Sequence, residues 1–502
     1  MTTDSADVAP PLSAPRIHAI FAGLVLVMLL GTIDQAIVAP ALAPIAAEFG
    51  RFADVSWVVT GYLLTSTAAT PLAGRLSDRH GRRAVILGAL LVFLAGSVAC
   101  AIAPGLAVLV LGRALQGLGG GALMTLPNTV IADILSPRER GRYQIYISAT
   151  YATSSAAGPI LGGWLADAFS WRWIFWINVP LVAAACLASW ATLGRLPARR
   201  ARVEMDYRGA LLMGSATICL LVALTRPELW ATRRVLAVLL AGAALLLGTG
   251  FVAWQRRARS PLLPPALLRN RVMVVTSVGG VAIAMVNMAL SIFIPLFLQL
   301  CRGMTVAGAG TLLVGLLLGV VGGAYSSGQY LRHTGRYRAP SLYGLAAAVV
   351  VLALLAGSLH AVTPPLLVAA TAVAGAGIGA CYPPMMVTSQ SAARGTDVGI
   401  ATGVHTFFRA LGGTFGAALF SMLLVAALGA QAPLLSAAHA RAAAPVLPPP
   451  QLYEVERAFS WLFALCAATL GIGWASLYCL PERALRGTAA SLDTGLDTGL
   501  AP

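Results

Sequence analysis

Asp34 is the one acid, of eighteen in the chain, that falls deep inside a long apolar segment. A carboxylate at such a position costs on the order of 3 kcal/mol, so an intramembrane acid predicts a functional site. Arg113 is also deep, about seven residues or roughly 10 Å from the outer end of another apolar segment. If the two segments run in opposite directions, both charges fall at comparable depth. We therefore predict a switchable ion pair between Asp34 and Arg113, with proton coupling as its chemistry.

Other chemistries lack the residues that they need. There is no paired-carboxylate, His-rich or Ser/His/Asp cluster at the ends of the apolar segments, so we do not expect an enzyme. The seven cysteines are scattered without metal-ligand spacing, and we read them as packing residues. A phosphate-binding loop of the Gly-x-x-x-x-Gly-Lys type needs a lysine, and the chain has none. We expect no metal and no cofactor.

The segments that position these residues are apolar along the whole chain. The 502 residues are 58% hydrophobic and 10% charged, with mean hydropathy +0.81, whereas soluble proteins are roughly 25% charged. Apolar runs of about 20 residues predict transmembrane helices rather than barrel strands. Fourteen such runs lie at 17–46, 55–74, 84–103, 106–134, 143–168, 173–194, 209–225, 235–254, 272–300, 306–331, 340–359, 364–390, 398–428 and 458–480. We predict an all-α membrane protein with 14 transmembrane helices.

The basic residues predict the orientation of these helices. All 34 are arginine, and with a cytoplasmic N-terminus 24 of them lie in inside segments and eight in outside segments. This is the positive-inside bias, and it explains the net charge of +16. We therefore expect the lipid bilayer, not nucleic acid, as the partner of this basic chain, with both termini cytoplasmic.

Glycine, proline and linker composition divide the chain into five regions. We predict a cytoplasmic tail at 1–16, a six-helix bundle at 17–194, a linker with two extra transmembrane helices at 195–271, a second six-helix bundle at 272–480 and a disordered cytoplasmic tail at 481–502. The basic, proline-bearing stretches that flank the two extra helices suit linkers between bundles.

The segment after the second apolar run has a distinctive pattern, Gly74-Arg75-Leu76-Ser77-Asp78-Arg79-His80-Gly81-Arg82-Arg83. Its glycines permit a tight turn, and its acid can accept hydrogen bonds from a neighbouring helix end. A simple positive-inside loop would explain the last two arginines but not the spaced glycines and the acid. The pattern resembles the signature loop between helices 2 and 3 of the major facilitator superfamily. The resemblance implies a conformational gate formed by Gly74, Asp78, Arg79, Gly81 and Arg82.

Further strings narrow this resemblance. Arg113-Ala114-Leu115-Gln116-Gly117 is similar to the helix-4 motif of the superfamily, and Ser154-Ser155-Ala156-Ala157-Gly158-Pro159-Ile160-Leu161-Gly162-Gly163 resembles the motif that marks its antiporter branches. Small residues let helices approach closely, although such packing is common in membranes without any function. The resemblance assigns the antiporter motif to Gly158, Pro159, Gly162 and Gly163.

The string around the buried acid, Ile33 to Ala43, looks like the first-helix motif of drug:proton antiporters with fourteen spans. It departs from that motif at Ala36, where threonine is usual, and at Ala43, where proline is usual. Trp171 to Pro180, Pro295 to Gln299 and Arg409 to Gly413 also resemble this branch. The resemblance covers residues 17–480 and is more specific in the N-terminal half.

The resemblance implies a major facilitator fold and a proton-coupled antiporter of the plasma (inner) membrane, one that exports amphipathic organic compounds such as drugs, antibiotics or toxic metabolites by alternating access. We expect it to function as a monomer. Candidate residues for a small-molecule organic substrate are the few polar or aromatic ones within spans: Tyr62, Gln116, Asn128, Tyr151, Asn287, Phe293, Tyr382, His405, Phe408 and Arg409. Two alternatives stay open, namely a dedicated exporter of one endogenous metabolite or antibiotic, and a membrane scaffold or sensor that has lost turnover.

Overall fold

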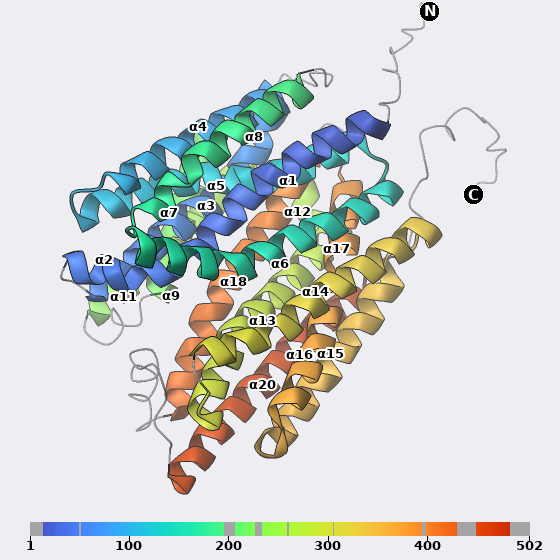
Figure 1. Cartoon of the computed structure of the whole chain (residues 1–502). Helices are drawn as coiled ribbons and strands as arrows, with labels where there is room; N and C mark the ends of the chain where they lie inside the picture. Colours follow the sequence, from blue (N-terminus) through green and yellow to red (C-terminus); the bar gives the residue numbers. More distant parts are fainter. Residues whose placement is uncertain are drawn as a thin grey trace, which may run out of the picture.

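The computed structural model describes residues 14–49, 52–194, 206–225, 233–258, 261–304, 306–393, 398–428 and 448–481, and all regular structure in them is helical (Figure 1). The N-terminal half contains α1 (Ala14–Ile37), the short 3₁₀ helix η1 (Ala39–Ala41), α2 (Leu42–Phe49), α3 (Phe52–His80), α4 (Arg82–Ala101), α5 (Leu106–Ile134), α6 (Pro137–Ala168), α7 (Trp173–Trp176) and α8 (Asn178–Leu193). The predicted tails lie outside the described residues, except for their inner ends.

The remaining helices form a linker and a second half. The linker holds α9 (Tyr207–Thr225), α11 (Arg234–Gln255) and α12 (Pro265–Arg269). The C-terminal half contains α13 (Arg271–Arg302), α14 (Val306–Thr334), α15 (Arg338–Ser358), η2 (Leu359–Ala361), α16 (Pro364–Gly379), α17 (Tyr382–Ser391), α18 (Val398–Leu428) and α20 (Pro449–Tyr478).

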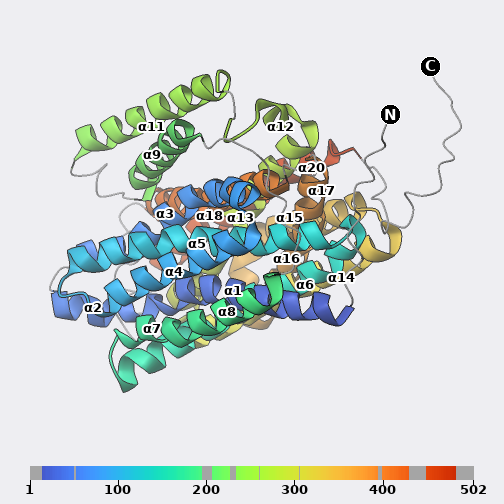
Figure 2. The same ribbon diagram turned by 90° about the horizontal axis from the view of Figure 1, so that it is seen from above.

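Each half packs around its own apolar core. Two clusters of buried side chains draw only on residues 20–193, and a third, larger cluster draws only on residues 275–480. A smaller cluster joins the linker to α18 through Met213, Phe251 and Val404. Helix α9 packs against both α3 and α18, so the linker helices cover the line where the two halves meet (Figure 2).

Within the described residues, twelve helices, not the fourteen expected, are long and apolar enough to cross a membrane. The two expected spans that fall short belong to α3 and α6, which are helices of 29 and 32 residues. Both helices contain several serine, threonine or glutamine residues, which lower their hydropathy, and some of these side chains are buried against neighbouring helices. Examples are the buried Ser66, Thr67 and Thr70 of α3 and the buried Gln144 and Ser148 of α6.

Prolines break two segments that we expected to be continuous. The predicted helix 17–46 ends at Ile37, and Pro40 then lies in η1 before α2 continues the chain. The predicted helix 364–390 is interrupted between α16 and α17, where Pro383 and Pro384 occupy the first turn of α17. Proline lacks the amide hydrogen that a continuous helix uses, which explains both breaks.

The expected loop at 74–83 is mostly helix. Helix α3 continues to His80, so Gly74, Asp78 and Arg79 lie on it and only Gly81 turns the chain, with a left-handed φ of +88°. Glycine adopts this conformation without steric cost, and α4 starts at the next residue.

The two halves touch on one side of the molecule, which we call the termini side because α1 begins and α20 ends there. Within the C-terminal half, Arg338 at the start of α15 donates to the carbonyl of Tyr478 at the end of α20 (2.7 Å), so α15 begins on this side. A Cβ at Gly74 would collide with the carbonyl of Gly399, and Gly141 and Gly328 bring α6 and α14 together in the same way. These close approaches place the contact between the halves at the termini side.

Candidate functional site

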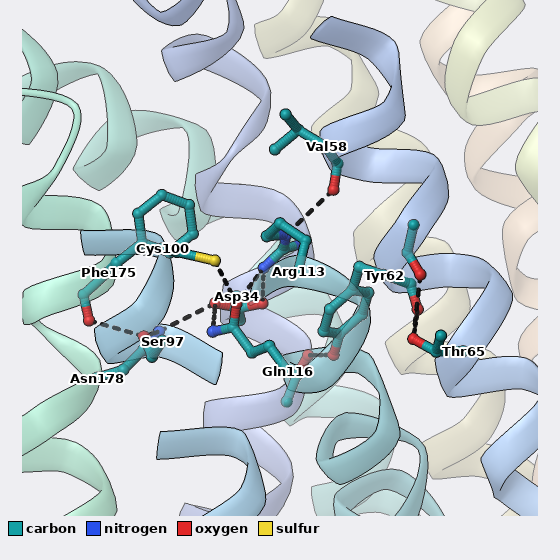
Figure 3. Close-up of polar contacts among 12 residues, drawn as sticks. Asp34, Val58, Tyr62, Thr65, Ser97, Cys100, Arg113, Gln116, Phe175 and Asn178 are labelled. Carbon is teal, nitrogen blue, oxygen red and sulfur yellow. Dashed lines mark hydrogen bonds and ion pairs between the residues drawn. The ribbon is translucent and has the colours of Figure 1, made fainter. Parts of the chain in front are cut away.

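Asp34 and Arg113 form the ion pair that their comparable depth predicts (Figure 3). Arg113 Nη1 lies 2.6 Å from Asp34 Oδ2, and the other carboxylate oxygen accepts from Gln116 Nε2 at 2.8 Å. Relative exposure is 0% for Asp34 and 1% for Arg113. Because a buried charge is stable only when paired and hydrogen-bonded, this pair depends on every donor around it.

The guanidinium group has further partners on α3 and α5. Arg113 Nε donates to the carbonyl of Val58 at 3.2 Å, and Nη1 donates to Gln116 Oε1 at 2.8 Å. The ring of Tyr62 lies 4.3 Å from the guanidinium carbon, within the range of a cation–π interaction. Two predicted substrate residues, Tyr62 and Gln116, therefore belong to the shell of the ion pair.

Sequence reasoning missed Asn178 and Ser97 as members of this site. Asn178 Nδ2 donates to Asp34 Oδ1 at 3.0 Å and to Ser97 Oγ at 2.9 Å, and Ser97 Oγ in turn donates to the carbonyl of Phe175 (Figure 3). Both side chains are buried. The available signal was an amide within the apolar run 173–194, since a buried amide needs partners.

The string around Asn178 also closes the other end of the N-terminal half. Arg172 Nη2 lies 2.7 Å from Glu48 Oε1, and Trp171 Nε1 donates to Glu48 Oε2 at 2.7 Å. These bonds, with that from Arg172 first, lower the pKa of the Glu48 carboxyl. The string Trp171 to Pro180 thus connects α2 to the start of α7 and contacts Asp34 through Asn178.

The antiporter-motif glycines pack α6 against the end of α1 that carries Asp34. A Cβ at Gly158 would collide with the side chain of Ala36, and a Cβ at Gly162 would collide with the carbonyl of Ile37. Pro159 lies inside α6, and Gly163 has more room, with Pro40 Cβ at 4.0 Å.

A hydroxyl pair lies on the other side of the acid. Ser154 Oγ lies 2.7 Å from Oγ1 of Thr32, and Thr32 is two residues before Asp34. The motif glycines and this pair therefore fix how closely α6 approaches the helix that holds the acid.

The predicted gate residues form a cluster on the termini side. Arg82 lies 2.5 Å from Asp78 Oδ1 and 2.7 Å from Asp133 Oδ2, and it also donates to Ser77 Oγ. Asp78 is buried against the first turn of α18. Its carboxylate oxygens lie so close to Gly399 that a Cβ at that glycine would collide with them. A helix N-terminus favours an anion at this position. Gly74 lies at the same contact, whereas Arg79 is half-buried next to Asp78 in the last turn of α3.

A second cationic site joins the two halves near the middle of α18. Arg409 Nη2 donates to Tyr151 Oη at 3.3 Å, and the guanidinium carbon lies 5.4 Å from the ring of Tyr151 and 5.7 Å from that of Tyr382. Tyr151 comes from α6, Tyr382 from α17 and Arg409 from α18. The structure thus brings three of the predicted substrate residues together.

Two further candidates lie beside them on α18. His405 is buried and Phe408 half-buried, and within the described residues His405 Nδ1 has no hydrogen-bond partner. His405 is four residues before Arg409, so the two share a helix face.

The other candidates lie apart from these sites. Asn128 Oδ1 accepts from Gln144 at 3.1 Å, and the carbonyl of Asn128 accepts from Gln390 Nε2 of the C-terminal half at 3.2 Å. Phe293 is buried in the core of the C-terminal half. Asn287 is half-buried, and its carbonyl accepts from Ser291. Asn128 therefore belongs to the contact between the halves on the termini side.

Membrane-length helices in two halves, each with its own core, and a buried ion pair in one of them define a polytopic membrane protein. Residues 24–417 match the family model described as Major Facilitator Superfamily. The chain belongs to the major facilitator superfamily, a family of transporters and not of enzymes.

Relatives agree with this family, and a solved structure agrees with the fold. The chain is 37% identical to an uncharacterized MFS-type transporter of Mycobacterium tuberculosis (strain ATCC 25618 / H37Rv) over 83% of this chain, but it spans only 61% of that protein. It is 29% identical to the multidrug transporter protein MdtP of Bacillus subtilis over 81% of this chain and 75% of that protein. The solved structure of the proton:xylose symporter XylE shares the fold, with a TM-score of 0.62, 14% identity and coverage of 94% of this chain and 97% of that one.

Proposed function

We propose that this transporter exports amphipathic organic compounds in exchange for protons, with Asp34 as the proton carrier and Arg113 as its partner. The observation that carries the proposal is the fully buried Asp34–Arg113 pair, held by the donors of Gln116 and Asn178. Relatives named as multidrug transporters, such as MdtP at 29% identity, support organic compounds as the cargo. Relatives named as efflux pumps support export as the direction of transport.

The proposed mechanism couples the charge of Asp34 to the position of α1. Protonation would remove the negative partner of Arg113 and weaken the bonds that hold α1 to α5 and α8. Because Gly158 and Gly162 pack α6 onto the end of α1, a small shift of α1 would be passed to α6. Helix α6 contacts α14 of the other half, so the same shift would reach the contact between the halves. Substrate would bind near the membrane midplane between the two halves, as in other transporters of this architecture.

The gate of this mechanism would be the cluster around Asp78. With its carboxylate against the first turn of α18, Asp78 would stabilise the conformation in which the termini side is closed. Gly74 and Gly81 would permit the close approach and the turn, and Arg79 and Arg82 would complete the cluster. Release of Asp78 from α18 would accompany opening on that side.

The proposal includes an arrangement in the plasma (inner) membrane. Helices α3 and α6 would also cross, giving fourteen spans, with bundles at 17–194 and 272–480 around the linker 195–271. The termini side would be cytoplasmic, as the positive-inside bias predicts, and the close contacts at Gly74 and Gly141 would then lie on the inner side of the membrane. We propose that one chain is the functional unit.

Purified protein in proteoliposomes tests the proton role of Asp34. The Asp34→Asn variant keeps a hydrogen-bonding side chain but cannot release a proton, so we expect substrate binding to persist and substrate-driven proton movement to stop. Asp167→Asn is the matched control, since Asp167 lies at the far end of α6 and should leave proton movement unchanged. Proton movement at the wild-type rate in Asp34→Asn would overturn the proposal.

A further inference from the structure

The C-terminal half holds a cation, Arg409, that forms no ion pair within the described part of the chain. The acids of that half are Asp397, which lies outside the described residues, and Glu454 and Glu456 in the first turns of α20, where Glu456 pairs with Arg302 at the end of α13. Among the described residues, no carboxylate lies within ion-pair distance of Arg409. Asp34, the acid predicted deep within the apolar segments, is already paired with Arg113.

Arg409 is placed where a transported compound could reach it. It lies about 16 Å from the first residue of α18, near half of the roughly 30 Å apolar thickness of a bilayer. Arg409, Tyr151 and Tyr382 are all half-buried rather than sealed, unlike Arg113 at 1% exposure. The three side chains come from both halves of the molecule, so they meet between the bundles.

The partners of Arg409 orient its guanidinium group without neutralising it. Two tyrosine rings flank the group, and its single described hydrogen bond goes to a phenol oxygen, a neutral acceptor. A guanidinium group has five N–H donors, and a carboxylate accepts two of them side by side. His405, on the same helix face, adds a buried ring whose Nδ1 has no partner among the described residues. The site therefore has donors and aromatic surface in excess of acceptors.

We propose that the transported compounds are organic anions: amphipathic molecules with a carboxylate that binds Arg409 and an aromatic or apolar body that packs on Tyr151 and Tyr382. This inference deepens the proposed export function and rests on it. A cationic compound would instead meet the unneutralised charge of Arg409 and be repelled.

Three compounds with one ring system and different charges test the inference: 2-naphthylacetate, its neutral amide 2-naphthylacetamide, and 2-(2-naphthyl)ethylamine. Binding of each tritiated compound to the purified full-length protein is measured by scintillation proximity. We expect the wild type to bind the acid at least about tenfold more tightly than the amide or the amine, because a charge-assisted bond contributes about this much.

Variants separate charge from packing. Arg409→Gln should lose this preference, because it weakens binding of the acid, relieves the repulsion of the amine and leaves the amide little changed. Arg409→Lys should retain part of the preference. Arg332→Gln, which removes an exposed arginine at the termini-side end of α14, is the matched control and should bind all three compounds as the wild type does. Equal weakening of acid, amide and amine in Arg409→Gln would overturn the inference, as would a wild type that prefers the amine.

The outcome is separable from that of the antiport proposal. If Asp34→Asn abolishes proton movement while the wild type shows no preference for the acid, only the anion inference fails. If the preference for the acid holds and depends on Arg409 while Asp34→Asn still moves protons at the wild-type rate, the anion inference stands and the proton role of Asp34 fails.

Discussion

The two intramembrane arginines, Arg113 and Arg409, have opposite surroundings. Arg113 is sealed in the N-terminal half, with a carboxylate, an amide oxygen, a backbone carbonyl and a tyrosine ring as partners. Arg409 is half-buried between the halves and, among the described residues, has only neutral partners. Arg113 is therefore an internal counter-ion in the N-terminal half, whereas the charge of Arg409 in the C-terminal half is free of an acidic partner among the described residues.

This difference indicates a division of labour between the halves. A sealed pair can exchange a proton but cannot bind a bulky compound, because its donors are already used. An open cation with aromatic neighbours can bind a compound but has no group that titrates near neutral pH, since arginine stays protonated. Proton and cargo would thus bind at separate places, and the contact between α6 and α1 would connect them.

The strongest test of the comparison removes each arginine in turn. Arg113→Met leaves Asp34 buried without its counter-ion and should destabilise the protein by about 3–5 kcal/mol. Arg409→Met removes a half-buried cation with neutral partners and should cost about 1 kcal/mol or less. Thermal unfolding of the purified variants in detergent measures both.

A double variant sharpens this test. Asp34→Asn combined with Arg113→Met should recover much of the lost stability, because no buried charge is then unpaired. Equal destabilisation by the two single variants, or a double variant no more stable than Arg113→Met, would contradict the contrast between sealed and open cations.

A smaller effect is expected at the crossing of α1 and α6. Gly162→Ala forces a methyl group against the carbonyl of Ile37 and should cost about 1–3 kcal/mol, with a loss of proton-driven transport. Gly88→Ala is the control, because a Cβ at Gly88 meets nothing within 4 Å. Unfolding and transport assays on both variants decide the matter: if Gly162→Ala behaves like Gly88→Ala, the close approach at α6 is not required.

The smallest effect on binding is expected at the gate, where the N-terminal half touches the helix that carries Arg409. Asp78→Asn should lower turnover several-fold and leave substrate affinity unchanged, because the carboxylate contacts the first turn of α18 and not the substrate. Asp133→Asn removes a second partner of Arg82 and should have less effect. Transport and binding are measured on the same preparation; a collapse of affinity with normal turnover per bound substrate would show that Asp78 is no gate.

The sequence predicted the Asp34–Arg113 contact but not the rest of its shell. Depth along two antiparallel segments is a one-dimensional property, and it was enough to place both charges at one level. The roles of Asn178, Ser97 and the carbonyl of Val58 depend on how α8, α4 and α3 rotate about their axes, and apolar runs with weak periodicity do not specify that rotation.

The number of membrane-spanning helices also depends on packing that the sequence does not specify. The sequence predicted both α3 and α6, but their polar residues keep the hydropathy of these two helices below that of the other twelve. Serine, threonine and glutamine lower hydropathy whether they face lipid or another helix, so composition cannot tell the two apart. The breaks after Ile37 and Gly379 depend on prolines whose position in the chain was visible but whose effect on helix continuity was underestimated.

The burial of Arg113 has an electrical consequence. Arginine keeps its charge, so a proton on Asp34 does not neutralise the site but converts a neutral pair into a net positive charge inside the bundle. Any rearrangement that carries this charge across part of the membrane then performs work against or with the membrane potential, up to about 2.3 kcal/mol for one charge across 100 mV. With the proposed orientation, an interior-negative voltage would pull the protonated form toward the inside. The rate of that step should therefore depend on voltage even in the absence of a pH gradient.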